Sequence, residues 1–470
     1  MHGRKAAGRT AVALGAVSVA AASVFAGGAP ALATVKPIPA VTGHVMVNDR
    51  SRQAPTSAEC LAQFDIACYS PQQIEDHYHL PTLYKQGLTG KGKTIIIVDS
   101  FGSPTIASDL QTFDAEFGLP NPALSIIQPA GAVPPFDPTN SDMVGWAEET
   151  TLDVEWSHSI APGANILLVE TPVSETEGVV GFPQIVEAEN YVINHHLGDV
   201  ISQSFGATEE TFPSADSLFD LRSAYKNAHA HNVTVLAASG DNGVTDNYDD
   251  LSCCYPYPVT SWPDSDTLVT AVGGTEVVPE SSGNPEGVSH DVVWHDLNKN
   301  IGGSPTDPTT CCAGGGGLSI FFSRPDFQDS VAGRVGKSRG VPDISMSASV
   351  KGAVLVYSSF QPLGQSWYPI AGTSEATPIF AGIVAIADQL AHRDLGLIND
   401  RLYAMAAAGG DNGIVDVTKG NNGMVFDDAH NNNALTTVTG WYAGVGYDLA
   451  SGLGTINAAE FIPALVNFKY

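Results

Sequence analysis

The feature that most constrains the fold is a series of short apolar runs that alternate with longer, mixed stretches. The apolar runs lie at 94–98, 165–169, 200–204, 233–238 and 267–272. Candidate helices lie at 105–117, 147–158, 182–195 and 215–231. Strands that alternate with helices favour a mostly parallel sheet covered on both faces. The sequence therefore predicts an α/β fold with a central, mostly parallel sheet flanked by helices.

Three of the predicted strands run directly into polar or glycine-rich turns. The turns are Asp99-Ser100, Phe205-Gly206 and residues 239–243. Carboxyl ends of parallel strands lie at one edge of a sheet, where the ligand sites of such folds form. We expect these turns to share one rim of the molecule.

The remaining segments define the predicted domain organisation. Residues 34–70, with several prolines and little periodicity, are expected to form a short, irregular N-terminal arm. One domain is predicted over 71–470, because no repeat or linker interrupts it. Within this domain, residues 377–392 predict a further apolar helix. The Gly/Asn/Asp-rich stretch 409–454 is expected to be too polar for the core.

Residues 1–33 have the pattern of a secretory signal. Basic residues precede an apolar stretch at 11–26, and Ala31-Leu32-Ala33 gives an Ala-x-Ala cleavage site before Thr34. The alternative, a membrane anchor, fits less well because the apolar stretch is short and is interrupted by Gly and Ser. We expect a secreted, extracellular protein with no membrane segment in its mature form.

Charge and cysteines narrow the class further. The chain has 21 Lys and Arg against 50 Asp and Glu, a formal net charge of -29, which makes nucleic acid an unsuitable partner. Six cysteines in an exported chain indicate disulfides. Cys60 and Cys68 can close a small loop. The doublets Cys253-Cys254 and Cys311-Cys312 are expected to bridge to each other, although the pairing of individual sulfurs stays open.

The strongest local motif is Gly-Thr-Ser-Glu-Ala-Thr-Pro at 372–378, which leads into the further apolar helix. Ser374 would lie at a helix N-terminus, where unpaired backbone N–H groups favour a developing negative charge. Pro378 is expected in the first turn, where its missing donor is tolerated. A simple capping role for Ser374 or Thr373 is the alternative.

A serine nucleophile needs a base, and the usual one is missing from the sequence. Subtilisins combine Gly-Thr-Ser-x-x-x-Pro with an Asp-Ser/Thr-Gly turn and a His-Gly-Thr box. Here Asp99-Ser100 is followed by Phe101, and no His-Gly-Thr occurs. A histidine-dependent rival would have to use Asp99 and His158, although His158 is better explained as a core or helix-face residue.

Glu149 and Asp153 offer a different base. Four residues apart on a predicted helix, they share a face and can touch. Two carboxylates so close repel, which raises the pKa of the pair and lets them share a proton. The alternative is a solvated acidic helix face, but Trp146, Leu152 and Trp156 make this helix unusually apolar.

Together these motifs resemble the sedolisin family of serine-carboxyl peptidases, which have a subtilisin-like fold of three layers. The family pattern is Glu-x-x-x-Asp, Ser-Gly-Asp-x-Gly and Gly-Thr-Ser-x-x-x-Pro, matched in that order at 149–153, 239–243 and 372–378. The resemblance implies that Ser374 is the nucleophile, that Glu149 is the general base and that Asp153 orients it. It places Asp241 at the oxyanion.

Asp241 can donate a hydrogen bond to an oxyanion only when its carboxyl is protonated. Catalysis would need Asp241 neutral and the Glu149/Asp153 pair partly ionised, conditions that meet at roughly pH 3 to 5. The resemblance also implies that Gly314–Gly317 lies beside the substrate. Glycines there would let a peptide backbone approach and pair as an added strand.

The resemblance further implies one structural calcium ion near the C-terminus. The matching positions are Asp416, Val417, Gly444, Gly446 and Asp448. Carboxylate and carbonyl oxygens on an irregular loop suit this ion.

The function predicted from these motifs is that of a secreted, acid-active serine endopeptidase that cleaves polypeptides as a monomer. Members of the family commonly carry a long N-terminal prodomain, and the arm at 34–70 is too short to be one. Tripeptidyl-peptidase action is one alternative that the sequence leaves open. The other is an inactive relative that binds peptides, although an idle site has no need for all four catalytic side chains.

Overall fold

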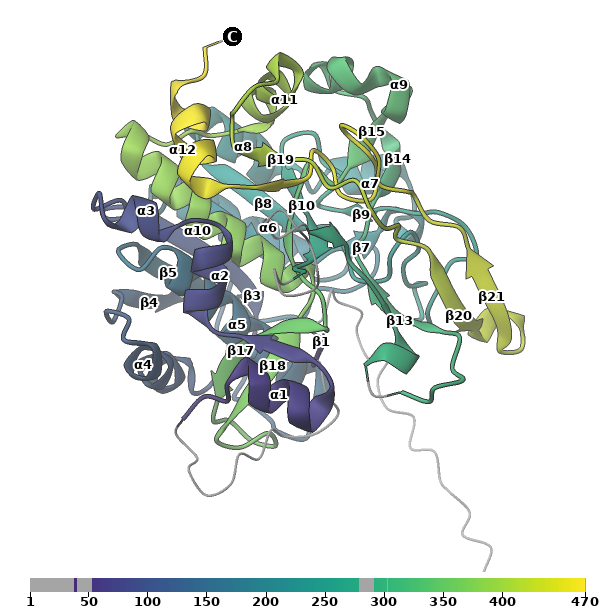
Figure 1. Cartoon of the computed structure of the whole chain (residues 1–470), viewed down its shortest axis with the longest axis horizontal. Coiled ribbons are helices and arrows are strands. Elements are labelled where there is room, and N and C mark those ends of the chain that lie inside the picture. Colours follow the sequence, from purple (N-terminus) through teal and green to yellow (C-terminus); the bar gives the residue numbers. More distant parts are fainter. Residues whose placement is uncertain (1–37, 40–52, 279–290, 302, 470) are drawn as a thin grey trace, which may run out of the picture.

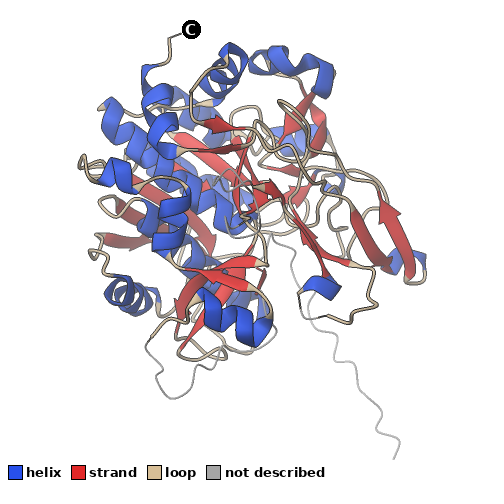
Figure 2. Ribbon diagram, viewed as in Figure 1, coloured by secondary structure: helices blue, strands red, loops and turns tan. Residues whose placement is uncertain are grey.

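A computed structural model describes residues 38–39, 53–278, 291–301 and 303–469. An eight-stranded sheet forms its centre, and helices cover both sides of the sheet (Figures 1 and 2). The strands of this sheet are β3 (Thr94–Ser100), β4 (Leu124–Ile127), β5 (Asn165–Thr171), β6 (Val200–Gln203), β8 (Thr234–Ala238), β10 (Thr270–Glu276), β11 (Val292–Val293) and β16 (Ile344–Ser347). The predicted three-layer α/β architecture is confirmed.

The sheet is parallel except at one edge. Its order is β11-β10-β8-β6-β3-β5-β4, with β16 paired to β10 in parallel and only β11 antiparallel. Along β3, Ile95 and Ile97 belong to the core on one face of the sheet, and Ile96 and Val98 to the core on the other. Side chains of a strand alternate between faces, so a continuous apolar run marks a strand buried on both.

Twelve α-helices occur in the described residues. They are α1 (Ser57–Phe64), α2 (Pro71–His77), α3 (Pro81–Tyr84), α4 (Ile106–Phe117), α5 (Ser141–Ile160), α6 (Phe182–Asn194), α7 (Ala215–Phe219), α8 (Ser223–His231), α9 (Ala332–Val335), α10 (Thr373–Ala391), α11 (Asn399–Ala408) and α12 (Ala458–Asn467). The predicted helix at 215–231 is wrong in one respect, because the chain breaks it into α7 and α8.

Helices α5 and α10 pack against each other on one face of the sheet. Gly382 of α10 makes the close approach possible, because a Cβ at this position would lie 2.7 Å from Ile160 at the end of α5. Helices α6 and α8 cover the opposite face. The two helices that carry the predicted nucleophile and base are therefore direct neighbours.

Smaller sheets lie outside the central sheet. A four-stranded sheet joins β1 (Ile38–Pro39), β2 (Ala67–Tyr69), β17 (Gly352–Ser358) and β18 (Ser366–Ala371). Two-stranded pairs are β7 (Ala207–Thr208) with β9 (Ser261–Trp262), β12 (His295–Leu297) with β13 (Thr310–Ala313), β14 (Gly317–Ser323) with β15 (Ser338–Val341), β19 (Ile414–Val415) with β22 (Thr455–Ile456), and β20 (Met424–Asp428) with β21 (Ala434–Val438).

The polar stretch 409–454 was expected to stay outside the core, and this is wrong. It contributes β19 and the β20–β21 hairpin, and it buries Met424, Phe426 and Val438 in a small cluster with Val244, Cys254 and Ala313. Leu449 and Leu453 join the main core. The buried apolar residues are separated by polar ones, so the average composition of the stretch does not indicate that it contributes to the core.

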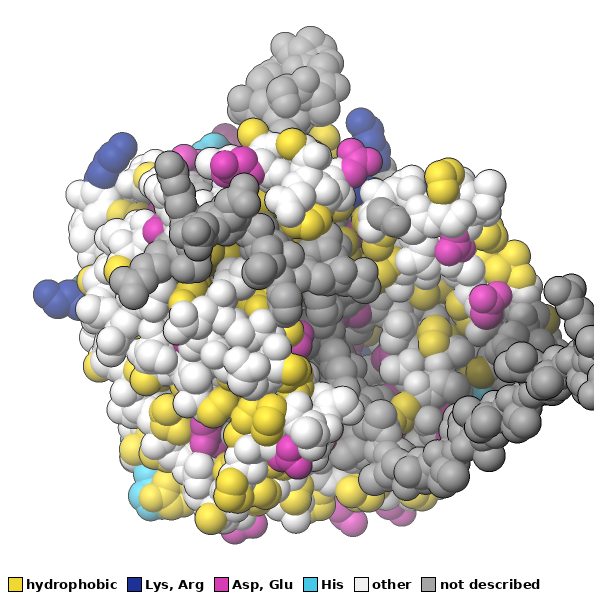
Figure 3. Space-filling model, turned by 90° about the horizontal axis from the view of Figure 1, so that it is seen from below, with side chains coloured by type: hydrophobic (Ala, Val, Ile, Leu, Met, Phe, Trp, Pro, Cys, Tyr) yellow, Lys and Arg dark blue, Asp and Glu magenta, His cyan; other side chains and the backbone are white. Residues whose placement is uncertain are grey.

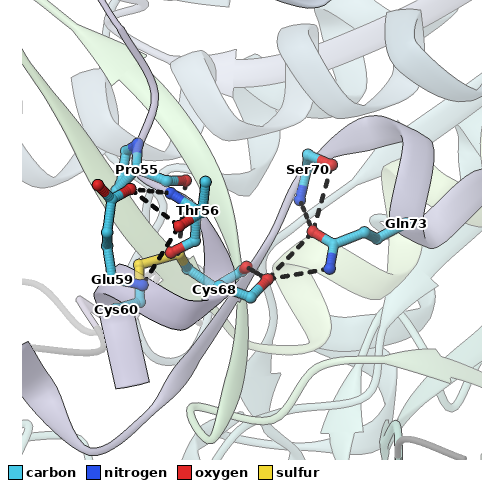
Figure 4. Close-up of a disulfide and its surroundings, with 8 residues drawn as sticks. Pro55, Thr56, Glu59, Cys60, Cys68, Ser70 and Gln73 are labelled. Atoms are coloured by element: carbon cyan, nitrogen blue, oxygen red, sulfur yellow. Dashed lines mark hydrogen bonds between the residues drawn. A yellow bond between two sulfur atoms is a disulfide. The ribbon is translucent and has the colours of Figure 1, made fainter. Parts of the chain in front are cut away.

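The N-terminal arm is more regular than its sequence predicted. Thr56 and Glu59 form a reciprocal capping box at the start of α1. A disulfide joins Cys60 to Cys68, as expected (Figure 4), and β2 then pairs in parallel with β17. The expected irregular arm is thus wrong for 57–69, which are anchored to the main body.

The predicted signal segment, residues 1–33, lies outside the described residues. Within the part of the chain that the structure describes, no helix is both long enough and apolar enough to cross a bilayer.

The two cysteine doublets do not bridge to each other. Cys253 is joined to Cys254, and Cys311 is joined to Cys312, so each disulfide links sequence neighbours. The expected cross-bridging is therefore wrong. The first pair lies in the loop after β8 and the second lies in β13, so each doublet closes within its own segment.

Acidic side chains are buried throughout the fold, and Figure 3 shows few Lys and Arg side chains on the surface that it views. Burial is the main cause of raised pKa values at these groups, because the charged form loses its hydration. The pKa rises to about 7 for Glu75, Asp99 and Asp241, and to about 8 for Glu189 and Asp388.

These buried acids predict a fold that is stable in acid and labile in alkali. A carboxyl whose pKa is raised on folding keeps its proton in the native state while the unfolded chain releases it, so stability falls as pH rises from about 4 to about 8. We expect Tm to drop by about 10 °C or more across this range. Calorimetry at fixed ionic strength measures it. Glu189→Gln should show a flatter dependence, and a Tm that rises with pH would contradict the explanation.

Candidate active site

Ser374 lies in the first turn of α10, and its side chain is fully buried. The helix begins at Thr373, after Gly372 at a φ of 125°. Glycine is needed at 372 because this φ is unfavourable for other residues. A Cβ there would also lie 2.7 Å from Asp241 Oδ2. The glycine lets the turn that carries the serine approach the Asp241 carboxyl closely.

Pro378 lies inside α10 and not in its first turn, which corrects the prediction. A proline has no N–H to donate to the carbonyl four residues earlier, here that of Ser374. The Ser374 carbonyl instead accepts a long hydrogen bond from Ser204 Oγ at 3.5 Å. The proline therefore frees this carbonyl for a contact with the loop after β6.

Glu149 and Asp153 lie on the buried side of α5, with 1% and 0% of their surfaces exposed. Ser204 Oγ donates a hydrogen bond to Asp153 Oδ1 at 2.9 Å. The Ser374 hydroxyl is near enough to Glu149 to lower its pKa by hydrogen bonding, although the contact falls short of standard hydrogen-bond geometry. The two side chains therefore lie close together, and their roles as nucleophile and base stay a prediction.

The electrostatics of this pair follow from burial. The Glu149 pKa is raised well above its usual value, first by burial and then by the charges of Asp153 and Asp99. Burial and the Asp99 charge likewise raise the pKa of Asp153. Each negative charge among Glu149, Asp153 and Asp99, together called the Glu149 unit, therefore makes the next harder to form.

Asp99 is the member of this unit that the sequence reasoning missed. It was assigned only to the histidine-dependent rival, yet it lies fully buried near the end of β3 and interacts with the α5 carboxyls. Burial raises its pKa to about 7, and the nearby Thr150 hydroxyl acts in the opposite direction. Its position at the end of a predicted strand could have indicated a place in the site, because the carboxyl ends of the strands meet at this rim. Ser204, after β6, shares that signal and was also missed.

His158 has no place in this arrangement. It is fully buried at the far end of α5, and its Nε2 atom lies 3.2 Å from Asp114 Oδ1 on α4. The expected core role is confirmed. The histidine-dependent reading finds no support in the geometry, because the carboxyl that contacts Ser374 is that of Glu149.

Asp241, in the loop after β8, contacts the same helix turn. Its Oδ1 accepts hydrogen bonds from the backbone N–H and the hydroxyl of Thr373, both at 2.8 Å. Its Oδ2 has no partner among the described residues. Burial raises its pKa to about 7, and the Thr373 bonds act in the opposite direction. A neutral Asp241 therefore holds Thr373 through one oxygen and keeps the other for a further contact.

The glycine run at 314–317 is buried beside the Asp241 loop. A Cβ on Gly315 would lie 1.8 Å from the carbonyl oxygen of Ser239, and one on Gly316 would lie 2.2 Å from that of Leu449. Packing against the protein's own backbone therefore requires glycine at these two positions. That a substrate peptide pairs with this segment stays a prediction.

The five predicted calcium positions come together in one loop region. Asp416 Oδ2 accepts a hydrogen bond from Gly446 N, and Asp448 Oδ2 accepts one from Gly444 N, both at 2.9 Å. Among the described residues, no group of three His, Cys, Asp or Glu side chains could hold a metal. Calcium binding at these positions would depend on two carboxylates and on backbone carbonyls, including that of Val417. Such an all-oxygen set suits calcium.

Comparison with known proteins extends this picture. The model of the subtilase family matches residues 141–425. Kumamolisin from Bacillus sp. strain MN-32 is 29% identical over 407 residues, and sedolisin from Pseudomonas sp. strain 101 is 29% identical over 392. These alignments cover 85% and 81% of this chain. Human tripeptidyl-peptidase 1 is 26% identical over 68% of the chain.

A solved structure of Pseudomonas sedolisin, a serine-carboxyl proteinase complexed with two molecules of pseudo-iodotyrostatin, has a TM-score of 0.65 and 25% sequence identity to this chain. The match covers 85% of this chain and 98% of that one. The curated relatives are longer: the chain spans 64% of kumamolisin, 59% of sedolisin and 52% of human tripeptidyl-peptidase 1.

Proposed function

Since the chain belongs to the subtilase family, and within it to the sedolisin family, we propose that it is an acid-active serine-carboxyl endopeptidase. The observation that carries the proposal is the contact of Ser374 with Glu149, a carboxyl paired with Asp153, at a site where subtilisins use histidine. Ser374, Glu149, Asp153 and Asp241 are the proposed catalytic residues.

In the first half of the reaction, Glu149 takes the proton of the Ser374 hydroxyl as the oxygen attacks the scissile carbonyl. The carbonyl π electrons move to oxygen and form an oxyanion. Protonated Asp241 would donate a hydrogen bond to it from Oδ2, the oxygen that has no partner in the resting site. Asp153, held by Ser204, orients Glu149 and shares the charge.

In the second half, the C–N bond breaks and protonated Glu149 gives its proton to the leaving amine. The acyl group stays on Ser374 as an ester. A water molecule then attacks this ester while Glu149 accepts a proton from it, and the same proton returns to Ser374 as the carboxylic acid leaves. Glu149 thus ends each cycle ready to accept again.

The test is the pH dependence of peptide cleavage. Activity needs the Glu149 unit partly ionised and Asp241 protonated. Since burial raises the pKa of Asp241 to about 7, cleavage should be lost as pH rises past that value. Hydrolysis of an unfolded protein between pH 2 and pH 9 should peak below about pH 6. A maximum at neutral or alkaline pH would contradict the proposal, as would no cleavage at any pH.

The same digests distinguish endopeptidase from tripeptidyl-peptidase action. Similarity to a relative named tripeptidyl-peptidase 1 keeps the second activity as a candidate. Mass spectrometry of early products would show internal cuts for an endopeptidase. Release of tripeptides only from free N-termini would contradict endopeptidase action and would identify the activity as that of a tripeptidyl-peptidase.

We also propose that the protein binds one calcium ion through the carboxylates of Asp416 and Asp448 and the carbonyls of Val417, Gly444 and Gly446. When bound, the ion would neutralise the two carboxylates and cross-link the loop structurally. Asp448 Oδ1 already accepts from Ala450 N, Ser451 N and Ser451 Oγ, so Oδ2 is the oxygen with spare capacity.

Export from the cell, polypeptide substrates and a monomeric state complete the proposal. Export is supported by the signal pattern at 1–33 and by disulfides in the folded body. The acidic net charge is consistent with the absence of a nucleic-acid partner.

A further inference from the structure

Glu375 is a buried acid that the proposed reaction does not use, although it directly follows Ser374 in the chain. It lies in the first turn of α10 and is 0% exposed. Neither of its carboxyl oxygens has a hydrogen-bond partner of standard geometry among the described residues. A polar side chain so deeply buried beside the nucleophile needs an explanation.

The groups around Glu375 come from four elements. The Ser347 hydroxyl, at the end of β16, is near enough to form a hydrogen bond with it. Ser347 N donates to Tyr78 Oη at 2.8 Å, which links this strand to the end of α2. The titratable groups that face Glu375 are Asp241 from the loop after β8, Tyr78, and Tyr69 of β2. None of these is a cation.

The surroundings favour the neutral form of Glu375. A helix N-terminus alone would favour its anion. Burial acts more strongly in the opposite direction and raises its pKa well above the usual value, and the Asp241 charge adds to this, against the effect of Ser347. Neutral Glu375 carries a proton and can donate it to the Ser347 oxygen, whereas its anion could only accept from the Ser347 hydroxyl and would hold a negative charge in this buried turn.

We propose that Glu375 is a positioning residue, which in its protonated form ties the turn that carries Ser374 to β16 and helps to set the alkaline limit of turnover. This inference rests on the proposed peptidase function. The same turn presents Thr373 to Asp241, so a shift of the turn would disturb both the nucleophile and the oxyanion contact. Ionised Glu375 would also add a negative charge near the oxyanion.

The test compares Glu375→Ala with Glu375→Gln. Loss of the side chain should lower kcat by about tenfold or more, because misplaced reacting groups are costly to the rate, while KM changes by less than about twofold. Glutamine keeps a donor and cannot ionise. It should restore most of kcat and move the alkaline limb of kcat/KM upward by about half a pH unit or more, since one of two coupled carboxyls is removed.

Asp388→Asn is the matched control. Asp388 lies near the other end of α10 and is also a buried acid, with a pKa raised to about 8, and it bonds to Leu395 N away from the serine. Its neutralisation should change stability and leave the alkaline limb in place. The inference is overturned if Glu375→Gln shows the wild-type pH profile, or if Asp388→Asn shifts the limb equally.

A failure of this inference is distinguishable from a failure of the proposed function. If Ser374→Ala is inactive while the Glu375→Gln profile equals that of the wild type, only the role of Glu375 is lost. If Ser374→Ala cleaves normally, the peptidase assignment itself is lost, and with it this inference.

Discussion

Ser374→Ala is expected to lower kcat by at least about 10⁴-fold. In the proposed mechanism, the substitution removes the oxygen that forms the ester with the substrate. The neighbouring hydroxyl, that of Thr373, is bonded to Asp241 and does not replace it. Kinetics on a peptide substrate at the acid optimum measure the loss. Because the hydroxyl has no partner of standard geometry among the described residues, its removal should leave Tm nearly unchanged.

The matched control is Ser159→Ala. Ser159 is also a fully buried serine, but its Oγ donates to the carbonyl of Trp156 within α5. This variant should keep most of the wild-type kcat. Retention of more than about a tenth of the activity by Ser374→Ala, with contaminating wild type excluded, would remove the nucleophile from the account.

Glu149→Gln is expected to lower kcat by about 10³-fold or more at every pH. Glutamine has the same shape but cannot accept the proton of Ser374, and Asp153 is held by Ser204 in an orienting position. The loss should persist across the whole profile, because a missing base is not restored by a change in pH. Steady-state kinetics between pH 2 and pH 9 test it.

Two further variants test whether a loss of activity in Glu149→Gln is specific to Glu149. Glu155→Gln, on the same helix, neutralises another fully buried acid that bonds to Tyr357 N, and it should retain activity. His158→Gln should also retain activity, because His158 pairs with Asp114. An active Glu149→Gln together with an inactive His158→Gln would restore the histidine-dependent rival.

Much of the fold was predictable from local pattern. The apolar runs at 94–98 and 165–169 became β3 and β5, because strands buried on both faces must be apolar throughout. The helix that carries Glu149 and Asp153 was recognisable from its spacing of acids and aromatic residues. These features depend on residues that are close together in the chain, so a single sequence is enough to predict them.

What could not be predicted depends on contacts between distant segments. Asp99 joins the carboxyl unit only because β3 ends beside α5, and the burial of Gly315 is imposed by the backbone of Ser239. The start of α10 at Thr373 was missed because Pro378 was given the place in the first turn. In each case, the missing information is a distance in space that no local pattern encodes.

The central claim is that a protonated carboxyl at Asp241 and an ionised one at the Glu149 unit act together. The pH dependence of kcat/KM for Asp241→Asn tests it most directly, because asparagine donates a hydrogen bond at every pH. The alkaline limb should move upward by about one pH unit or more, while the acid limb stays where it is. An alkaline limb that coincides with that of the wild type would contradict it.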